Sequence, residues 1–115
     1  MTISRFAPAG RGSGSVVHGD TVYLSGQVNS DRSLGVTGQT RAILEQIEAR
    51  LVEAGSDKSR ILSVQIWLAD IATFAEMNEA YDAWLDRDNM PARATVEARL
   101  ASPDYLVEIW VIAAR

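Results

Sequence analysis

One carboxylate, Glu108, interrupts an otherwise apolar stretch near the end of the chain. The run 105–114, Tyr-Leu-Val-Glu-Ile-Trp-Val-Ile-Ala-Ala, is typical of a β-strand, in which successive side chains alternate between two faces. Glu108 therefore shares a face with Trp110 and Ile112, and the opposite face is apolar as well. A buried carboxylate needs a cation, hydrogen-bond donors, a proton or a ligand, so Glu108 is a candidate catalytic residue.

Among the basic residues that precede Glu108, the nearest apart from Arg99 is Arg93, which enters a second predicted strand over 94–100. The turn residues of 101–104, Ala-Ser-Pro-Asp, predict that the two strands form an antiparallel hairpin. In such a hairpin Arg93 and Glu108 lie several residues apart along the sheet, too far for a close ion pair. The gap leaves room for a small anion-bearing ligand between the two side chains.

The composition indicates one globular domain, residues 1–115, and limits the chemistry available to it. The chain has no cysteine and one histidine, so we expect no disulfide, no zinc site or other metal, and no thiolate nucleophile. A net charge of −4 argues against nucleic acid as a partner. No apolar run is long enough to cross a bilayer and the first residues lack a secretory signal, so we expect a cytoplasmic protein without a membrane partner.

Hydrophobic periodicity predicts the element order ββ-α-β-α-ββ, with 3–7 as a candidate for an extra strand. The predicted elements are a hairpin over 15–27 turning at Gly19-Asp20, a helix over 37–53 ended by Gly55, a strand over 61–69, a helix over 71–86 capped by Asp70, and the hairpin described above. In the strand over 61–69, the apolar residues from Leu62 to Leu68 alternate with Ser63, Gln65 and Trp67 and are expected to share one face.

The predicted sheet has a second apolar face. Two helices can cover only one face of such a sheet, and Trp110 and Ile112 lie on the other. That face is too apolar to be left in water, so we expect it to meet another subunit.

Two glycine-containing segments and two polar side chains are further candidates. The segment 10–15, Gly-Arg-Gly-Ser-Gly-Ser, leads into a strand rather than a helix, so a mobile lead-in or a loop covering a ligand is a better interpretation than a phosphate loop. Ser25-Gly26 interrupts a strand, which indicates a bulge or a close backbone approach to a ligand. His18 is better explained as a surface residue than as a general base. Asn78 can reach the sheet edge or remain a surface amide.

A set of short motifs, in order and spacing over roughly 16–115, resembles the RidA family of reactive intermediate deaminases, once called YjgF or L-PSP. The motifs are Ser25-Gly26-Gln27, Gln39-Thr40, Glu53-Ala54-Gly55, Leu68-Ala69-Asp70, Phe74-Ala75-Glu76-Met77-Asn78, Pro91-Ala92-Arg93, Val107-Glu108-Ile109 and Ile112-Ala113-Ala114-Arg115. One such tripeptide carries little weight, but the ordered set is specific. The resemblance implies a chorismate-mutase-like α+β fold, with a mixed sheet and two helices on one face. It also implies a homotrimeric barrel with ligand clefts at the subunit interfaces.

The resemblance also implies roles for individual residues. The arginine of the Pro-Ala-Arg motif holds the substrate carboxylate in that family, and the glutamate of the last strand activates water; these are Arg93 and Glu108. The other substrate-binding candidates, matched in the same way, are Ser25, Gly26, Asn78 and Thr95. Thr95 replaces a cysteine of the family pattern, and Gly10-Arg11-Gly12 replaces a Gly-Pro-Tyr segment, which indicates a divergent subgroup.

Three hypotheses about activity follow. The first is an enzyme of the 2-iminobutanoate/2-iminopropanoate deaminase type, which hydrolyses 2-imino or enamino acids such as 2-aminoacrylate to 2-oxo acids and ammonia without a cofactor. The second is a non-catalytic trimer that binds small carboxylates or regulates another process. The third is ribonuclease or translation-inhibitor activity, an older label for the family, against which the acidic charge and the lack of a histidine pair argue. Alternatively, Arg93 and Glu108 only complete an ion network at an interface.

Overall fold

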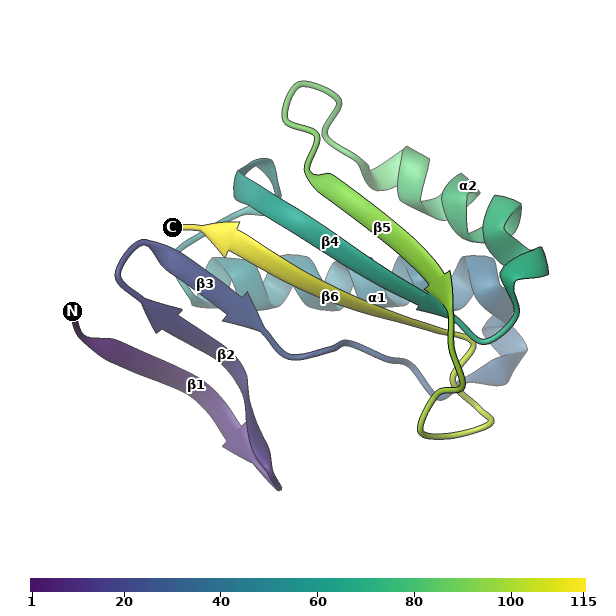
Figure 1. Ribbon diagram of the computed structural model, residues 1–115, viewed down its shortest axis with the longest axis horizontal. Helices are drawn as coiled ribbons and strands as arrows, with labels where there is room; N and C mark the ends of the chain where they lie inside the picture. The colour runs from purple at the N-terminus through teal and green to yellow at the C-terminus, as the bar shows by residue number, and fades with distance from the viewer.

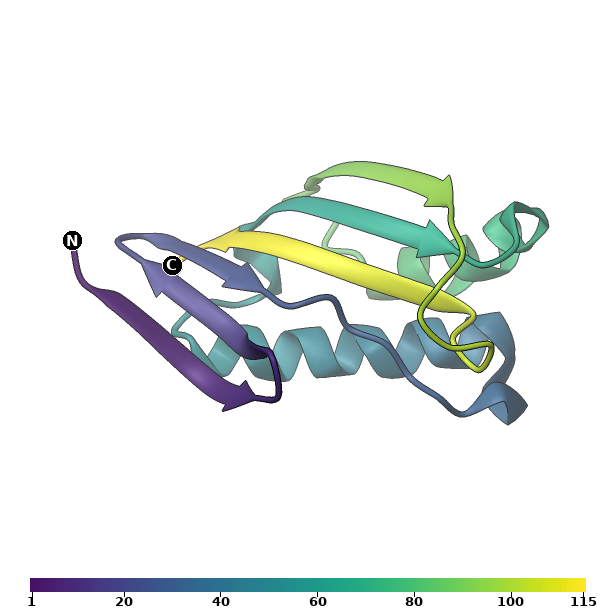
Figure 2. The ribbon, with the colours of Figure 1, turned by 60° about the horizontal axis from the view of Figure 1, so that its bottom comes forward.

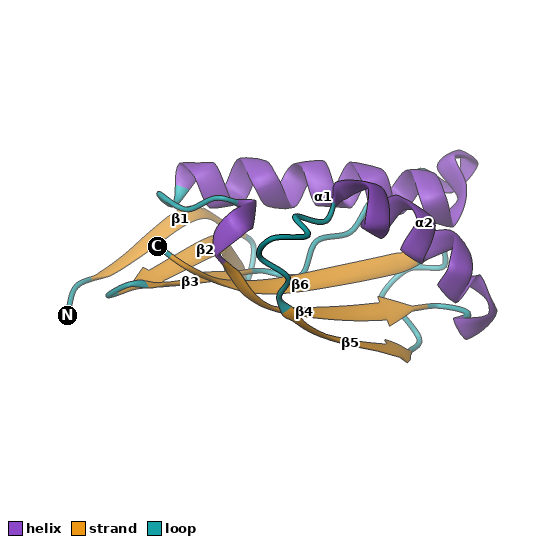
Figure 3. Cartoon of the chain, turned by 90° about the horizontal axis from the view of Figure 1, so that it is seen from above, coloured by secondary structure: helices purple, strands orange, loops and turns teal.

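The computed structural model describes all residues, 1–115, as one mixed β-sheet with both helices packed on the same face (Figures 1 and 3). The elements are β1 (Ile3–Ala9), β2 (Gly12–His18), β3 (Thr21–Leu24), α1 (Gly35–Glu53), β4 (Ile61–Leu68), α2 (Phe74–Trp84), β5 (Ala92–Glu97) and β6 (Val107–Ala114), with short 3-10 turns at Arg32–Leu34, Lys58–Arg60 and Ile71–Thr73. The expected α+β class and the helix-covered mixed sheet are therefore confirmed, and the candidate N-terminal strand is present as β1.

The sheet order is β1-β2-β3-β6-β4-β5, and β4 and β5 form its only parallel pair. The predicted hairpin of β5 and β6 is therefore wrong, because β4 lies between these two strands. The physical reason is the crossover: α2 connects β4 to β5, and a strand–helix–strand unit places its two strands in parallel. The chain then passes over the end of β4 before it returns as β6 (Figure 1).

The hydrophobic core lies between the sheet and α1, which runs lengthwise along it (Figure 2). The helical spacing of Ile43, Leu44, Ile47 and Leu51 predicts one apolar stripe on the first helix, and all four side chains are at most 1% exposed. The facing residues of β6 are Val107, Ile109 and Val111, also at most 1% exposed. The alternation along β6 thus turns these three side chains to the helices and leaves Glu108, Trp110 and Ile112 on the open face.

One register prediction fails at the start of β4. Ile61 pairs with Ala113 and Ser63 with Ile112, so Leu62 is the extra residue of a β-bulge. The bulge reverses the alternation at this point, and Leu62 is 52% exposed while Ile61 is buried. From Val64 to Leu68 the predicted alternation is confirmed.

The glycine-rich segment 10–15 is part of a β-hairpin and not the mobile lead-in that the sequence favours. Gly10 and Arg11 form the turn of the β1–β2 hairpin, and the residues from Gly12 onward belong to β2. Gly10 has a φ of +57°, a conformation that glycine adopts without steric cost. The glycines therefore serve a hairpin turn and a strand.

The helix ends agree with the sequence to within a few residues. α1 begins at Gly35, two residues before the predicted start, and Gly55 follows its end with a φ of +85°. Asp70 accepts a hydrogen bond of 2.9 Å from the backbone N–H of Ala72, as expected for a cap, but it caps a 3-10 turn that precedes α2. None of the helices is both long and apolar enough to cross a lipid bilayer.

Candidate functional site

Glu108 lies half-buried on the open face of the sheet, opposite Trp67 of β4. Its carboxylate forms no ion pair, and no charged neighbour contributes to its titration within the subunit. Desolvation by burial raises the pKa of Glu108 above its usual range. A raised pKa is the direction that suits an acid–base residue, and its cause here is loss of water rather than a neighbouring charge.

The backbone of Gly26 lies directly against this carboxylate. A Cβ built on Gly26 would overlap the Oε2 atom of Glu108 and lie 3.2 Å from its Cδ atom. Tyr23 pairs with Ile112 but Gln27 pairs with Ile109, so the β3 side contains one extra residue, which makes Ser25-Gly26 a bulge. The bulge interpretation of this glycine is therefore confirmed. Within the subunit its backbone approaches the Glu108 side chain, and an approach to a ligand stays a prediction.

The Ser25 hydroxyl is engaged inside the bulge. It donates to the backbone carbonyl of Gly14 at 3.2 Å and accepts from the Gln27 amide at 3.0 Å. The Ser25 backbone N–H donates to the same Gly14 carbonyl at 3.0 Å. Ser25 therefore fixes the bulge, and it lies next to Gly26 at the Glu108 half of the candidate site.

Arg93 is positioned by three side chains of α2. Its Nη1 donates to the Oδ1 atom of Asn78 at 2.8 Å, and its guanidinium carbon lies 4.6 Å from the ring centre of Tyr81 and 5.8 Å from that of Phe74. Aromatic faces attract a guanidinium and restrict its orientation. Asn78 therefore reaches the sheet edge, one of its two expected positions, and holds the arginine rather than standing alone.

Arg93 and Glu108 lie on opposite faces of the sheet. Arg93 pairs with Val64, whose side chain is in the core under the helices, whereas Glu108 pairs with Trp67 on the open face. The expected gap between their two side chains is therefore wrong for a single subunit. The error follows from the hairpin prediction, because the intervening β4 adds a strand and the pairing fixes which face each side chain takes.

Thr95 lies two residues after Arg93 and so on the same face of β5. Its Oγ1 atom is buried and has no hydrogen-bond partner. A buried hydroxyl without a partner is uncommon and costs stability. The structure thus brings Arg93, Asn78 and Thr95 together as one half-site, and Ser25, Gly26 and Glu108 as another.

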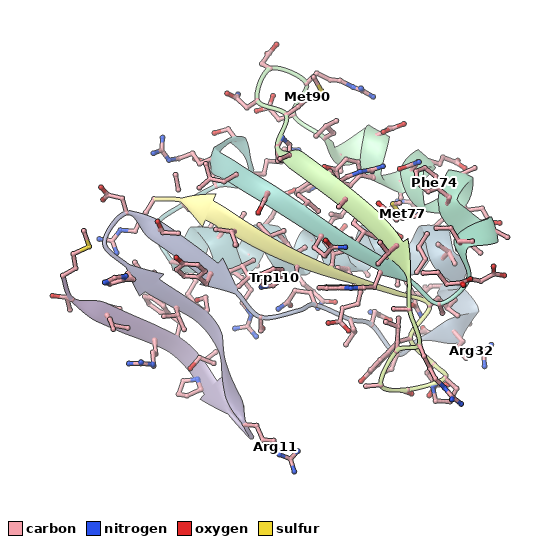
Figure 4. All side chains as sticks on the ribbon, in the orientation of Figure 1. Arg11, Arg32, Phe74, Met77, Met90 and Trp110 are labelled. Atoms are coloured by element: carbon pink, nitrogen blue, oxygen red, sulfur yellow. The ribbon has the colours of Figure 1, made fainter.

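Two surface hollows adjoin Arg93, and the largest hollow lies apart from both half-sites. One of about 250 Å³ adjoins Arg93 and is lined by Asn78, Tyr81, Asp82, Leu85, Met90, Pro91 and Arg93. A second, of about 270 Å³, lies along β4 and β5 and reaches Trp110 of β6, a residue that Figure 4 labels. The largest, about 770 Å³, lies under the β5–β6 connection and contains none of the predicted site residues. No cluster of three histidine, aspartate or glutamate side chains is present to hold a metal ion.

Sequence reasoning missed the aromatic support of Arg93. Helical spacing places Phe74 and Tyr81 on one apolar stripe of the second helix, a pattern typical of buried core, yet Phe74 is 39% exposed and both rings lie under the guanidinium. One signal in the sequence could have indicated this support. Phe74 and Tyr81 are seven residues apart on one face of the helix, and this helix directly precedes the strand of Arg93. Trp67 was also missed, because only strand pairing shows that it faces Glu108.

Comparison with known proteins supports the family resemblance over almost the whole chain. Residues 2–115 match the family model described as Endoribonuclease L-PSP. The chain is 44% identical over 114 residues to the RutC family protein YoaB of Escherichia coli, covering 99% of both, and 43% identical over 114 residues to a RutC family protein of Haemophilus influenzae, covering 98% of both.

A solved structure agrees with these sequence matches. A member of the YjgF protein family from Neisseria meningitidis superposes with a TM-score of 0.93 at 40% identity, covering 100% of this chain and 96% of that one. The resemblance noted in the sequence motifs is thereby confirmed at the level of sequence, fold and chain length. The chain therefore belongs to the family known as L-PSP, YjgF or RidA.

Proposed function

We propose that the protein hydrolyses reactive 2-imino and enamino acids, such as 2-aminoacrylate and 2-iminopropanoate, to 2-oxo acids and ammonia. The observation that carries the proposal is the Glu108 carboxyl, which is desolvated, unpaired and held against the Gly26 backbone on the open face. A carboxyl with a raised pKa exchanges protons near neutral pH more readily than an ordinary glutamate. Belonging to the RidA family supports this class of role.

Arg93 supplies the binding half of the reaction. The guanidinium is a planar fork that binds a carboxylate through two parallel hydrogen bonds. Asn78 uses the Nη1 edge and the rings of Tyr81 and Phe74 fix the plane, so the orientation of the fork is set before a ligand arrives. Such preorganisation lowers the entropic cost of binding the carboxylate of a 2-imino acid.

Glu108 supplies the proton transfers. Its carboxylate form accepts a proton as water adds to the electrophilic C=N carbon, which gives a tetrahedral carbinolamine. For an imine whose nitrogen is already protonated, this carbinolamine is neutral. The Glu108 carboxyl then returns the proton to the amino group. The C–N bond breaks as the carbinolamine hydroxyl becomes the carbonyl and gives its proton to the Glu108 carboxylate, so that ammonia and the 2-oxo acid leave and the carboxyl releases the last proton to water. The step consumes one water molecule, involves no oxidation or reduction and needs no metal or organic cofactor.

The site requires two subunits. Arg93 and Glu108 face opposite sides of one sheet, so a small ligand reaches both only if the arginine comes from a neighbouring copy. Arg93 lies on β5, an edge strand, and the open face carries Tyr23 and Trp110, which are 41% and 38% exposed. An apolar face next to an unpaired strand edge suits association with further copies. We propose the homotrimer with interfacial clefts that the sequence resemblance implies.

A second candidate function is a non-catalytic trimer that binds small carboxylates. The observation that favours it is that Asn78 and Tyr81 hold Arg93 without any participation of Glu108. In that case 2-oxo acids bind but imines are not consumed faster than in buffer. Substitution of Glu108 separates the two functions, because it removes proton transfer and leaves the arginine in place.

Ribonuclease activity, which the description of the matching family model names, is less well supported by this chain. The net charge is −4, whereas RNA-binding surfaces are basic. The single histidine, His18, is exposed beside the β2–β3 turn and has no second histidine to complete an acid–base pair.

The deciding experiment is ammonia release from freshly generated 2-iminopropanoate, followed with and without the protein. Free imines hydrolyse in water unaided, so the rate above the protein-free blank is the quantity of interest. A larger imine, 2-iminobutanoate, tests how much side chain the site accepts. A rate equal to the blank for both imines, together with binding of pyruvate, would support the carboxylate-binding function instead.

A further inference from the structure

The bulge that touches Glu108 is held by a buried glutamine. Gln27 is 7% exposed, and its amide nitrogen donates to the Ser25 carbonyl at 3.1 Å and to the Ser25 hydroxyl at 3.0 Å. Its backbone exchanges two hydrogen bonds with Ile109, the residue after Glu108, at 2.8 and 3.1 Å. Gln27 thus joins the bulge to the strand of Glu108 through both its side chain and its backbone.

A second glutamine, from α1, completes the connection. The amide nitrogen of Gln46 donates to the Oε1 atom of Gln27 and to the carbonyl of Val28, both at 3.3 Å. The Gln27 amide is therefore used at both ends, since its oxygen accepts from the helix and its nitrogen donates to the bulge. This arrangement fixes the orientation of the amide, because rotating it by 180° would place two donors against each other.

The chain of hydrogen bonds ends at the position of Gly26. Ser25 and Gln27 flank this glycine. Ser25 is held by its hydrogen bond to the Gly14 carbonyl, and Gln27 is held by the hydrogen bond that it accepts from Gln46. Gly26 is in turn the backbone that excludes water from the Glu108 carboxylate, with no space for even one added carbon atom between them. A shift of the bulge would therefore change both the position and the hydration of the carboxylate.

We propose that Gln27 and Gln46 are positioning residues for Glu108, and that together they transmit the position of α1 to the reacting carboxylate through the Ser25-Gly26 bulge. The role in catalysis rests on the proposed imine hydrolysis. The positional role does not, because it concerns the Glu108 side chain itself. Neither glutamine touches the substrate in this arrangement.

The groups around Glu108 make its titration a direct measure of this role. Trp67 faces it from β4, Gly26 faces it from the bulge, and neither titrates. Burial alone raises the pKa of Glu108, with no charged side chain of the same subunit contributing. If the bulge loosens, water reaches the carboxylate and the pKa of Glu108 falls toward its usual range.

The test compares Gln27→Met and Gln46→Met with the wild type, using the assembled protein. Methionine keeps the length and volume of glutamine and removes its hydrogen bonds. We expect kcat for 2-iminopropanoate to fall roughly 10- to 100-fold for Gln27→Met and about 10-fold for Gln46→Met, because small displacements of a reacting group cost that much. KM should change little, since Arg93 holds the carboxylate. The double variant should be no slower than Gln27→Met, because both residues act through one bulge.

A second measurement on the same variants is an NMR titration of the ¹³C-labelled Glu108 carboxyl. We expect a downward shift of its pKa in both variants. Ser56→Ala is the matched control: it removes the buried hydrogen bond from the Ser56 hydroxyl to the Ala114 carbonyl at the far end of β6, and should lower stability without moving the Glu108 titration or kcat.

The outcomes separate the two proposals. If the wild-type protein releases ammonia no faster than buffer but the Glu108 titration shifts in the variants, imine hydrolysis fails and the positional role stands. If the wild type is active and neither variant changes the Glu108 titration or kcat, the positional role is refuted. Should Gln27→Met not fold, Gln46→Met decides alone, because Gln46 is only half-buried and its loss leaves Gln27 bonded to Ser25.

Discussion

The two half-sites hold their charged groups in opposite ways. Arg93 is exposed, donates to Asn78 at 2.8 Å and lies over the rings of Tyr81 and Phe74, so its charge is permanent and its orientation is fixed. Glu108 is half-buried, lacks an ion-pair partner and is pressed against the Gly26 backbone, so its charged form is disfavoured. The first arrangement suits the binding of an anion, and the second suits a change of protonation state.

The separation of Arg93 from Glu108 within one subunit has a consequence for the pKa of Glu108. An arginine beside Glu108 would stabilise the carboxylate, lower its pKa and remove its readiness to exchange a proton. Placed on opposite faces, the two groups keep these properties within one subunit. In the proposed trimer, a second copy and a ligand would bring them together. A bound substrate carboxylate between them would then neutralise Arg93 and leave Glu108 free to act.

Glu108→Gln should give the largest effect on activity. The amide keeps the shape of the carboxyl but cannot exchange a proton, so imine hydrolysis should fall roughly 10²- to 10⁴-fold, down to the uncatalysed rate at most. Binding of pyruvate, measured by calorimetry, should survive because Arg93 is untouched. Full activity of this variant would remove Glu108 from catalysis and favour the carboxylate-binding function.

Mixing two inactive variants tests whether each site spans two subunits. Co-expression of Glu108→Gln with Arg93→Ala should restore roughly a quarter of the wild-type activity, because in a randomly mixed ring one site in four pairs an intact arginine with an intact glutamate. The double variant, expressed alone, is the control and should stay inactive. A site within one subunit would give no recovery, and sedimentation equilibrium that shows only monomers would exclude both the trimer and the shared site.

Gly26→Ala tests the contact between the bulge and the carboxylate. The added Cβ would overlap Oε2 of Glu108, so the carboxyl must move, and hydrolysis should fall roughly 10- to 100-fold with the fold retained. Gly12→Ala is a matched control, because a Cβ on Gly12 meets no atom within 4 Å. Equal activity of the two alanine variants would show that the close contact has no role in catalysis.

The sequence predicts those parts of the fold that depend on local periodicity. The α1 stripe, the alternation along β6 and the cap at Asp70 follow from spacing and residue type, and the structure agrees with them. The interruption at Ser25-Gly26 was also visible, because glycine inside a strand pattern marks a bulge or a close approach. These features are fixed by a few neighbouring residues, so one sequence is enough to find them.

Strand pairing could not be predicted in the same way. The turn residues between β5 and β6 favoured a hairpin, whereas the α2 crossover placed β5 parallel to β4. That single error led to the expected ligand gap between Arg93 and Glu108 within one subunit, and it hid Trp67 as the neighbour of Glu108. The bulge at Leu62 was missed for a related reason, since only the partner strand shows that one residue is extra.

Arg93→Lys should weaken binding without removing the charge. Lysine cannot form the two parallel hydrogen bonds of a guanidinium and cannot keep the same stacking on Tyr81, so the affinity for pyruvate-like anions should fall by about 1–2 kcal/mol, roughly 5- to 30-fold. Calorimetry on the folded variant measures it. An unchanged affinity would place the anion elsewhere and leave Arg93 as a structural residue of the β5 edge.

The pH dependence of stability gives the smallest effect. It distinguishes an unpaired Glu108 carboxyl with a raised pKa from a Glu108 that belongs to an ion network at a subunit interface. Below the usual pKa range of a glutamate, the Glu108 carboxyl is protonated in both the folded and the unfolded state, and the glutamine variant should match the wild type in thermal midpoint. As pH rises through that range toward the raised pKa of the folded protein, the unfolded chain gives up its proton first, so the wild type loses stability. The uncharged glutamine has no such loss.

Glu108→Gln should therefore equal the wild type at acidic pH and match or exceed it at neutral pH, when thermal midpoints are compared between about pH 4 and pH 8. If Glu108 instead pairs with an arginine of a neighbouring subunit at rest, its pKa in the assembly would be lowered and the sign reverses. The wild type would then be the more stable protein at neutral pH, because the variant leaves a buried cation without its partner. The sign of the difference in thermal midpoint at neutral pH, measured on the assembled protein, distinguishes two arrangements. In one, Arg93 and Glu108 are separated until a ligand binds between them; in the other, Glu108 forms a direct ion pair with an arginine.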